Sequence, residues 1–312
     1  MNEWYTTYRL DMEIVFQSAF ERIQCYPPLF REQAEAYIHK FNPLVKESTN
    51  NYICYLLPFW VKDAAGIGQH TSRELSIANV FVMLYFFIQD DLMDSHQKDW
   101  KNKLALGNLF QTTYLDLYRR LFTSESSFWR YYRQYVEEWS IRVTSASTYN
   151  LFEHAPASLA GKASPVKLAS TGAMLLGDKE PLVEEASHLI DHVLATLQMV
   201  DDWIDWEEDL LEGSDNSFVD FIRLQQQLQI TDTVTAELMN RWIFTTDALA
   251  RFTRYAADRH RLITSYSVPY KHLLDFHKSL IQQLEEAYRH IAATKSSMLR
   301  GGLIHYLSSV MK

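Results

Sequence analysis

The sequence has few of the residues that interrupt regular structure. Its 312 residues include nine glycines and eight prolines, and the alternation of apolar and polar residues that marks half-buried strands is missing. Apolar residues recur instead with the 3.6-residue period of a helix over long segments. We therefore expect an all-α protein, a single-domain bundle of about ten or more helices over residues 1–312.

Cysteines and targeting segments are also scarce. Two cysteines, Cys25 and Cys54, cannot build a disulfide framework, which favours a reducing, cytoplasmic location. The N-terminus lacks the basic and apolar regions of a signal peptide. The most apolar run, Ile77–Ile88, is too short to cross a bilayer, so we expect a buried core helix and no integral membrane segment.

Positive charge is in deficit. The chain has 30 lysines and arginines against 39 aspartates and glutamates, which gives a net charge of −9. Proteins that bind nucleic acid usually carry a basic patch or an excess of basic residues. We therefore expect no nucleic-acid partner. The sequence leaves the oligomeric state open between a monomer and a homodimer.

Aspartate residues cluster at the ends of two apolar segments that are expected to be helical. In the first, Tyr85–Ile88 leads into Asp90, Asp91 and Asp94. At 3.6 residues per turn, Asp90 and Asp94 share one helix face, and Asp91 lies at its edge. This first motif closes a helix that we expect to start at Thr71 or Ser72 and to extend to about residue 97.

The second motif contains Asp201, Asp202, Asp205 and Asp209. Asp201, Asp205 and Asp209 are spaced i, i+4, i+8 and form a stripe on one face of the helix. We expect Pro181 in the first turn of this helix and Gly213 just after its last turn, and we expect an irregular segment over residues 154–177 before it.

Both motifs need a source of compensating charge. Like charges four residues apart destabilise a helix by a few tenths of a kcal/mol per pair, and a divalent cation reverses the sign of that interaction. Mg²⁺ takes one or two carboxylates together with waters and substrate phosphate oxygens. The motifs therefore predict a shared Mg²⁺ cluster that holds a diphosphate. The alternatives are a solvated helix face, or a non-enzymatic helical protein whose acidic stripes bind cations or a basic partner.

Together, Asp90-Asp91-x-x-Asp94 and the second acidic helix resemble the class I isoprenoid synthases. The run from Gln198 to Asp205 is similar to the second motif of trans-prenyl diphosphate synthases. The longer run from Asp201 to Asp209, with Gly213 after it, is similar to the tetraprenyl-β-curcumene synthase group, also called large terpene synthases. In that group a tyrosine stands at the position of Asp202, which would leave the stripe as the metal face.

This resemblance implies an all-α bundle around a central apolar cavity, with three Mg²⁺ ions held between the motifs. It assigns metal binding to both motifs, and a catalytic role to the first. Candidates for contact with the diphosphate are basic, tyrosine or amide residues near either motif or in the C-terminal region: Lys162, Lys167, Gln198, Arg254 and Tyr255. Arg142 is the last arginine before the second motif and a further candidate without other support.

The chain departs from the chain-elongating members of the family. It lacks their Gly-Gly-Lys-Arg type of stretch near the N-terminus and the arginine pair after the first motif, where Ser95–Lys101 contains no arginine. A condensation needs two diphosphate sites, whereas a cyclisation needs one diphosphate and an apolar cavity. The sequence therefore favours a terpene cyclase that acts on a linear prenyl diphosphate. The many Phe, Tyr and Met residues indicate a roomy apolar pocket, which favours a substrate of twenty carbons, with fifteen or twenty-five carbons as alternatives.

A cyclase must surround a carbocation with apolar and aromatic groups that exclude water. Aromatic faces stabilise a cation by about 0.5–2 kcal/mol each, so Tyr85, Phe86 and Phe87 are candidates for the substrate pocket. Ordinary core packing is the alternative role for each of them. For the chain as a whole, a trans-prenyltransferase and a squalene-type coupling enzyme remain alternative functions.

Overall fold

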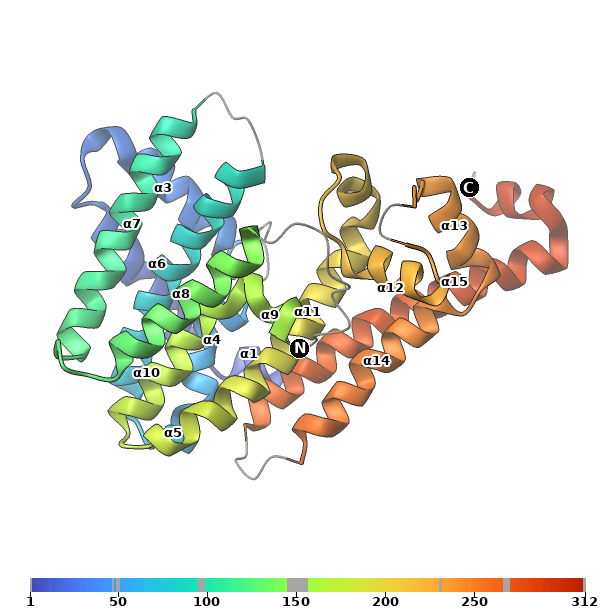
Figure 1. Cartoon of the computed structure of the whole chain (residues 1–312). Helices are drawn as coiled ribbons and strands as arrows, with labels where there is room; N and C mark the ends of the chain where they lie inside the picture. Colours follow the sequence, from blue (N-terminus) through green and yellow to red (C-terminus); the bar gives the residue numbers. More distant parts are fainter. Residues whose placement is uncertain are drawn as a thin grey trace. The chain divides into compact units, whose positions relative to one another are not determined.

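The computed structural model describes residues 2–46, 48, 51–94, 99–144, 157–229, 232–265 and 270–310 (Figure 1). Within these ranges all regular structure is helical and no strand occurs. The expected all-α fold is confirmed.

The chain divides into two compact units. Unit 1 is made of Met1–Ser140, Ala163–His188 and Val268–Leu273, and unit 2 of Ile141–Lys162, Leu189–Ser267 and Leu274–Lys312. The first acidic motif lies in unit 1 and the second in unit 2. The prediction of one domain over residues 1–312 stays a prediction, because this division of the chain does not test it.

Unit 1 is organised around α6 (Gln69–Asp94). All residues from 75 to 84 are buried, because the neighbouring helices of the unit pack on several faces of α6. These neighbours are α2 (Arg9–Ile23), α4 (Ile53–Trp60), α7 (Trp100–Leu121) and α10 (Leu168–Leu176). The two polar side chains of this stretch find carbonyl partners on α4: the Ser76 hydroxyl donates to Tyr55 at 2.6 Å, and the Asn79 amide donates to Cys54.

The apolar character of α6 matches its position in the core. Among the described residues, Gln69–Met93 is the one stretch long and apolar enough to cross a membrane, and 67% of its most apolar window is buried inside the protein. A buried core helix gives the same signal. The expectation of a core helix is borne out.

The start of α6 differs from the expected one. The helix begins at Gln69, and both the amide and the hydroxyl of Ser72 donate to the carbonyl of Gly68, at 3.1 and 3.3 Å. Ser72 is therefore inside the helix, and the N-cap prediction at Thr71 or Ser72 is wrong. The apolar periodicity located the helix. A serine or threonine near its start can either cap the helix or lie inside it and donate to the i−4 carbonyl, and the sequence pattern does not distinguish these two positions.

The segment expected to be irregular is helical in its described part. It contains α9 (Ala157–Ala160), the 3₁₀ helix η1 (Gly161–Lys167) and α10. Gly172 lies within α10, where a Cβ atom would come within 2.9 Å of Leu75 on α6. This glycine permits close helix packing and does not break the helix, which is why the prediction failed. His154 and Pro156 lie outside the described residues.

Unit 2 contains most of α11 (Val183–Glu212), with the helices that follow it. Aromatic rings join three of its helices: Phe218 of α12 packs edge-on against Trp203 of α11 at 5.0 Å and against Phe252 of α14 at 5.1 Å between ring centroids. As expected, Gly213 ends α11 with a left-handed φ of +74°. Pro181 lies in a 3₁₀ turn, η2 (Glu180–Leu182), directly before α11.

The remaining helices have the following bounds: α1 Glu3–Thr6, α3 Pro28–Phe41, α5 Lys62–Ala65, α8 Phe128–Thr144, α12 Ser217–Gln225, α13 Ala236–Thr245, α14 Ala248–Ile263 and α15 Lys271–Val310.

Candidate functional site

In the first motif, Asp91 has a cationic partner. Its Oδ2 atom accepts hydrogen bonds from the Tyr37 hydroxyl of α3 at 2.9 Å and from Lys103 Nζ of α7 at 3.1 Å. The Lys103 side chain is 16% exposed and that of Asp91 34%. Burial, together with the hydrogen bond to Asp91, raises the pKa of Tyr37, so this phenol remains a donor. The Asp91 charge is thus balanced within unit 1.

The other carboxylates of the first motif lie on the same last turns of α6. Asp90 is half-buried and takes part in interactions of its own. Asp94 is the last residue of the helix, and its side chain lies outside the described part of the structure. The predicted metal-binding role of this motif stays a prediction.

In the second motif, Asp201, Asp205 and Glu208 are exposed on α11. No lysine or arginine among the described residues forms an ion pair with any of the three. Desolvation by the surrounding protein, followed by the charges of Asp202 and Asp205, raises the pKa of Asp201 to about 7, although part of its side chain is open to solvent. Desolvation and the charges of Asp209 and Glu208 also raise the pKa of Asp205. These carboxylates repel one another without compensation.

Asp202 is different, because it is 4% exposed and both of its carboxylate oxygens have protein donors. Oδ1 accepts from the Gln198 amide at 2.7 Å, and Oδ2 accepts from the backbone N–H of Ser217 at 2.8 Å. Burial raises its pKa, while the donors Ser217 and Gln198 act in the opposite direction. Asp202 therefore binds the first turn of α12.

Asn216 connects the same helices. Its Oδ1 atom caps α12 by accepting from the amides of Phe218 and Val219, at 3.0 and 3.1 Å. Its Nδ2 group donates to the Asp202 carbonyl at 2.8 Å and to Asp209 Oδ2 at 2.7 Å. One oxygen of Asp209 is therefore already engaged by the protein.

An arginine also reaches this region. Arg142 of α8 donates from Nη1 to Asp215 Oδ2 at 2.9 Å and from Nε to the Ser158 carbonyl at 3.1 Å. The two charged side chains are 13% and 17% exposed. Asp215 directly precedes Asn216, so Arg142 brings a positive charge next to the loop between α11 and α12. Its position was not evident from the sequence because 73 residues separate the two partners.

Lys167, a predicted diphosphate ligand, lies in unit 1 and is 3% exposed. Its amine donates to Glu138 Oε2 at 2.8 Å and lies 4.7 Å from the centre of the Tyr135 ring. Burial alone would raise the pKa of Glu138, but the hydrogen bond and charge of Lys167 outweigh it and lower the pKa. Lys167 thus balances the charge of the half-buried Glu138 carboxylate.

The other predicted diphosphate ligands belong to unit 2. Gln198 uses its amide group on Asp202. Lys162 is half-buried in η1, and Arg254 is exposed on α14. The Tyr255 hydroxyl accepts from Arg259 Nη2 at 2.6 Å, and the Arg259 guanidinium also lies over the Tyr255 ring. The diphosphate role of these residues stays a prediction.

The three aromatic residues before the first motif face different neighbours. Phe86 is buried and packs against Trp139 of α8, with 4.8 Å between ring centroids. Tyr85 contacts Tyr114 of α7, whereas Phe87 packs against Phe41 of α3. Tyr85 and Phe86 also contact each other. The three side chains thus contact different neighbours, and their role in a substrate pocket stays a prediction.

The donor set fits Mg²⁺ in its chemistry, because exposed carboxylate oxygens are the ligands that this ion prefers. In the described part of the chain, however, no three acidic, histidine or cysteine side chains converge on one point that could hold an ion. The residues could thus supply part of a coordination shell, which waters and substrate oxygens would complete.

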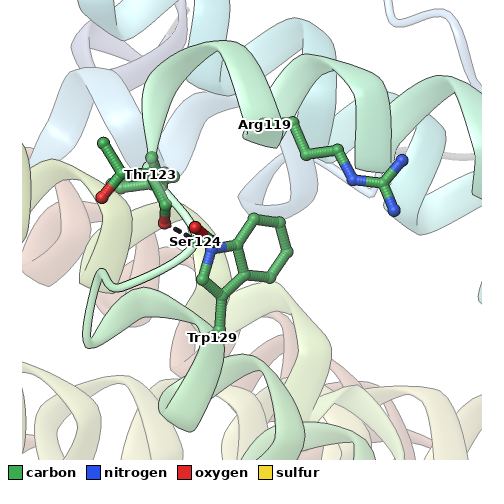
Figure 2. Close-up of a pocket in the computed structure, with 5 residues that line it drawn as sticks. Arg119, Thr123, Ser124 and Trp129 are labelled. Atoms are coloured by element: carbon green, nitrogen blue, oxygen red, sulfur yellow. Dashed lines mark hydrogen bonds between the residues drawn. The ribbon is translucent and has the colours of Figure 1, made fainter.

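A pocket of about 400 Å³ lies elsewhere in unit 1, at the turn between α7 and α8 (Figure 2). Arg119 and the Trp129 ring are among its lining residues, and the Trp129 indole N–H donates to the Thr123 carbonyl at 2.8 Å. Arg119 lies 16 residues after Lys103 on α7, a distance of about 24 Å along a helix. This pocket is therefore remote from Asp91.

Comparison with known proteins adds no assignment: no protein-family model matches the chain, and no curated protein matches it. The resemblance to the class I isoprenoid synthases rests on the two acidic motifs and the all-α fold.

Proposed function

We propose that this protein is a Mg²⁺-dependent terpene cyclase that acts in the cytoplasm on a linear prenyl diphosphate, preferably one of twenty carbons. The observation that carries the proposal is the uncompensated charge on α11. Asp201 and Asp205 are exposed, lack a basic partner among the described residues, and have raised pKa values. Such a row of carboxylates is costly unless a cation binds to it.

In this proposal the bound ions neutralise the diphosphate and make it a better leaving group. Asp201 and Asp205 hold ions on α11, and Asp90, Asp91 and Asp94 do so on α6. Arg142 adds positive charge near the loop after α11, where it is held by Asp215 at 2.9 Å. Phe86 and Tyr85 contribute aromatic faces that exclude water and stabilise a cation by about 0.5–2 kcal/mol each.

The main competing function is a helical protein that binds cations or a basic partner without catalysis. The acidic face of α11 favours that function equally, because exposed carboxylates attract any cation. The Asp91–Lys103 pair favours neither function, since an internal ion pair can be structural or can open when a metal binds. Turnover of a prenyl diphosphate is expected only of the cyclase and therefore distinguishes the two functions.

The test is incubation with farnesyl, geranylgeranyl and geranylfarnesyl diphosphates, each with Mg²⁺ and with EDTA, followed by mass spectrometry of the extracts. We expect a cyclic hydrocarbon or alcohol from one substrate, and none in EDTA. A linear product that requires added isopentenyl diphosphate would replace the cyclase by a trans-prenyltransferase. No diphosphate release from any substrate would favour the non-enzymatic function.

Two variants of α11 make the test specific to this site. Asp205→Asn removes a charge from the exposed row, whereas Glu207→Gln removes an equal charge about 160° away from Asp205 around the helix. Both side chains are exposed. We expect Asp205→Asn to lose most of the product and Glu207→Gln to keep it.

A further inference from the structure

One end of unit 1 differs in charge from the chain as a whole. Residues 116–133, which contain the turn between α7 and α8, carry four arginines and two carboxylates, so this stretch is positive in a chain whose net charge is −9. All four arginines are exposed: Arg119, Arg120, Arg130 and Arg133. A surface of this kind attracts anionic ligands to a site that lies on it.

The pocket of about 400 Å³ at the α7–α8 turn lies within this basic stretch (Figure 2). Its volume is typical of sites for small molecules. Two aromatic residues are among those that line it. Phe122 is 5% exposed and stacks on Phe128 with 4.0 Å between ring centroids, whereas Trp129 is half-buried. The pocket therefore combines an apolar wall with a basic surface.

The Trp129 ring is held in one orientation by the protein. Its indole N–H donates to the Thr123 carbonyl at 2.8 Å. The ring also packs edge-on against Phe128 and Tyr132, with 5.3 and 6.1 Å between centroids. An aromatic ring that is already fixed loses little conformational freedom when a planar group stacks on it. Trp129 is thus preorganised to bind a flat ligand.

The cationic group of the pocket is only weakly engaged. Arg119 pairs with Asp116 at 3.4 Å, and both side chains are more than half exposed. Such exposed pairs contribute little to stability. The planar guanidinium has five N–H donors, and its fork geometry matches a phosphate or carboxylate group. Arg119 can therefore bind an anion at this pocket.

An acidic group lies next to the opposite side of the pocket. Figure 2 shows Ser124 beside the N–H edge of the Trp129 indole, while the Arg119 side chain extends away from Ser124. The Ser124 hydroxyl donates to Glu125 Oε1 at 2.6 Å, and this hydrogen bond lowers the pKa of Glu125. The ionised Glu125 carboxylate is an acceptor for an N–H group of a ligand.

We propose that this pocket binds a purine nucleoside monophosphate whose base carries an amino group. The base stacks on Trp129, the phosphate pairs with Arg119, and the amino group donates to Glu125. A nucleotide suits this order of groups, because its amino edge and its phosphate lie at opposite ends of the molecule. The site is independent of the proposed cyclase site, since Arg119 is about 24 Å along α7 from Lys103.

Four ligands test the three contacts in titration calorimetry of the full chain. AMP offers all three groups, adenosine lacks the phosphate, ribose 5-phosphate lacks the base, and IMP has a carbonyl oxygen in place of the amino group. We expect AMP to bind with a Kd below about 1 mM. The other three ligands should bind about tenfold more weakly or worse, because each loses one contact.

Variants locate the site. Arg119→Gln should lower the affinity for AMP about tenfold and leave that for adenosine unchanged, because the arginine contacts only the phosphate. Arg120→Gln is the matched control, since Arg120 is exposed but is not among the lining residues, and it should stay within about twofold of wild type. Trp129→Leu should weaken AMP and adenosine alike and leave ribose 5-phosphate unchanged. Both arginine variants should keep the wild-type unfolding midpoint within about 1 °C.

Several results would overturn the proposal. Failure of AMP to bind to the wild type would reject the site, and equal affinities for AMP and ribose 5-phosphate would reject a nucleotide as its ligand. Equal affinities for AMP and IMP would remove Glu125 from the contacts. Wild-type affinity for AMP in Arg119→Gln would place the nucleotide elsewhere, even if Trp129→Leu fails to fold. The terpene cyclase proposal stands or falls separately, because it is tested by turnover.

Discussion

The two acidic motifs look alike in sequence but differ in how their charge is balanced. Asp91 of the first motif is bonded to Lys103 and Tyr37, whereas Asp201 and Asp205 of the second have no such cation among the described residues. The first motif is therefore partly neutralised by its own unit before any ligand arrives. A run of aspartates therefore locates negative charge in the sequence but does not reveal whether a cation of the fold already neutralises it.

The largest expected effect is on catalysis, and it distinguishes a variant of the second motif from a variant of the first. In Asp205→Asn we expect kcat/KM with the preferred prenyl diphosphate to fall by roughly 100-fold, because metal stabilisation of the leaving group contributes several kcal/mol. The unfolding midpoint should not fall, since a repulsive charge is removed. Asp91→Asn should lower both quantities. Equal midpoints in the two variants would abolish the distinction between the motifs.

The second expected effect is a pH dependence of stability that arises from His277, a buried histidine in unit 2. The Nε2 atom of His277 lies 2.8 Å from the Thr196 hydroxyl, and its Nδ1 atom lies 2.9 Å from that of His260. Burial, followed by the positive charges of His260, His192 and Arg259, lowers the pKa of His277 to about 3.

The sign of the pH effect follows from this lowered value. Between pH about 6.5 and 3, unfolded His277 takes up a proton that the folded protein excludes, so stability falls as the pH is lowered through this range. Urea unfolding at several pH values should show this slope in the wild type and a smaller one in His277→Gln. An identical slope in both proteins would show that other groups cause it.

A third effect tests the balance within the first motif. Lys103→Met removes the cation but keeps most of the apolar length of the side chain, and leaves Asp91 with Tyr37 as its donor. We expect a loss of about 1 kcal/mol in unfolding free energy, since the pair is partly exposed. Lys62→Met, next to the exposed Asp63, is the control and should cost less. Equal losses would mean that the Asp91–Lys103 pair contributes nothing specific.

The smallest expected effect concerns Asp201. Its folded pKa of about 7 lies above the unfolded value near 3.9, so its contribution to stability is present at low pH and is lost as the pH rises through 7. In EDTA, the unfolding midpoint of the wild type should therefore decline more between about pH 5 and pH 8 than that of Asp201→Asn. Added Mg²⁺ should reduce the difference, because the ion stabilises the charged carboxylate.

Local periodicity predicted much of the fold. The helices that carry the two motifs were expected within a few residues, because each has an apolar face that repeats every three to four positions. The sequence failed where glycine and proline suggested breaks that packing overrides, as in η1 and α10, where Pro165 sits in a 3₁₀ turn.

Only those features of the site that depend on spacing within one helix could be predicted from the sequence. The i, i+4 spacing placed Asp201 and Asp205 on one face, but it could not show that Asp209 would be drawn to Asn216. The sequence Asn216-Ser217 before an apolar run is typical of an N-cap, and this signal could have identified Asn216. The Arg142–Asp215 pair left no such signal, because only the tertiary fold brings these distant residues together.

The hydrogen bond from the Ser217 amide to Asp202 also affects how fast this amide exchanges its hydrogen with water. The first amides of a helix lack internal acceptors and usually exchange their hydrogens with water rapidly. Ser217 is 0% exposed, and its N–H is held by a buried carboxylate. Its deuterium uptake should therefore be slow, and the start of α12 should open together with the packing of this unit and not by fraying from its end.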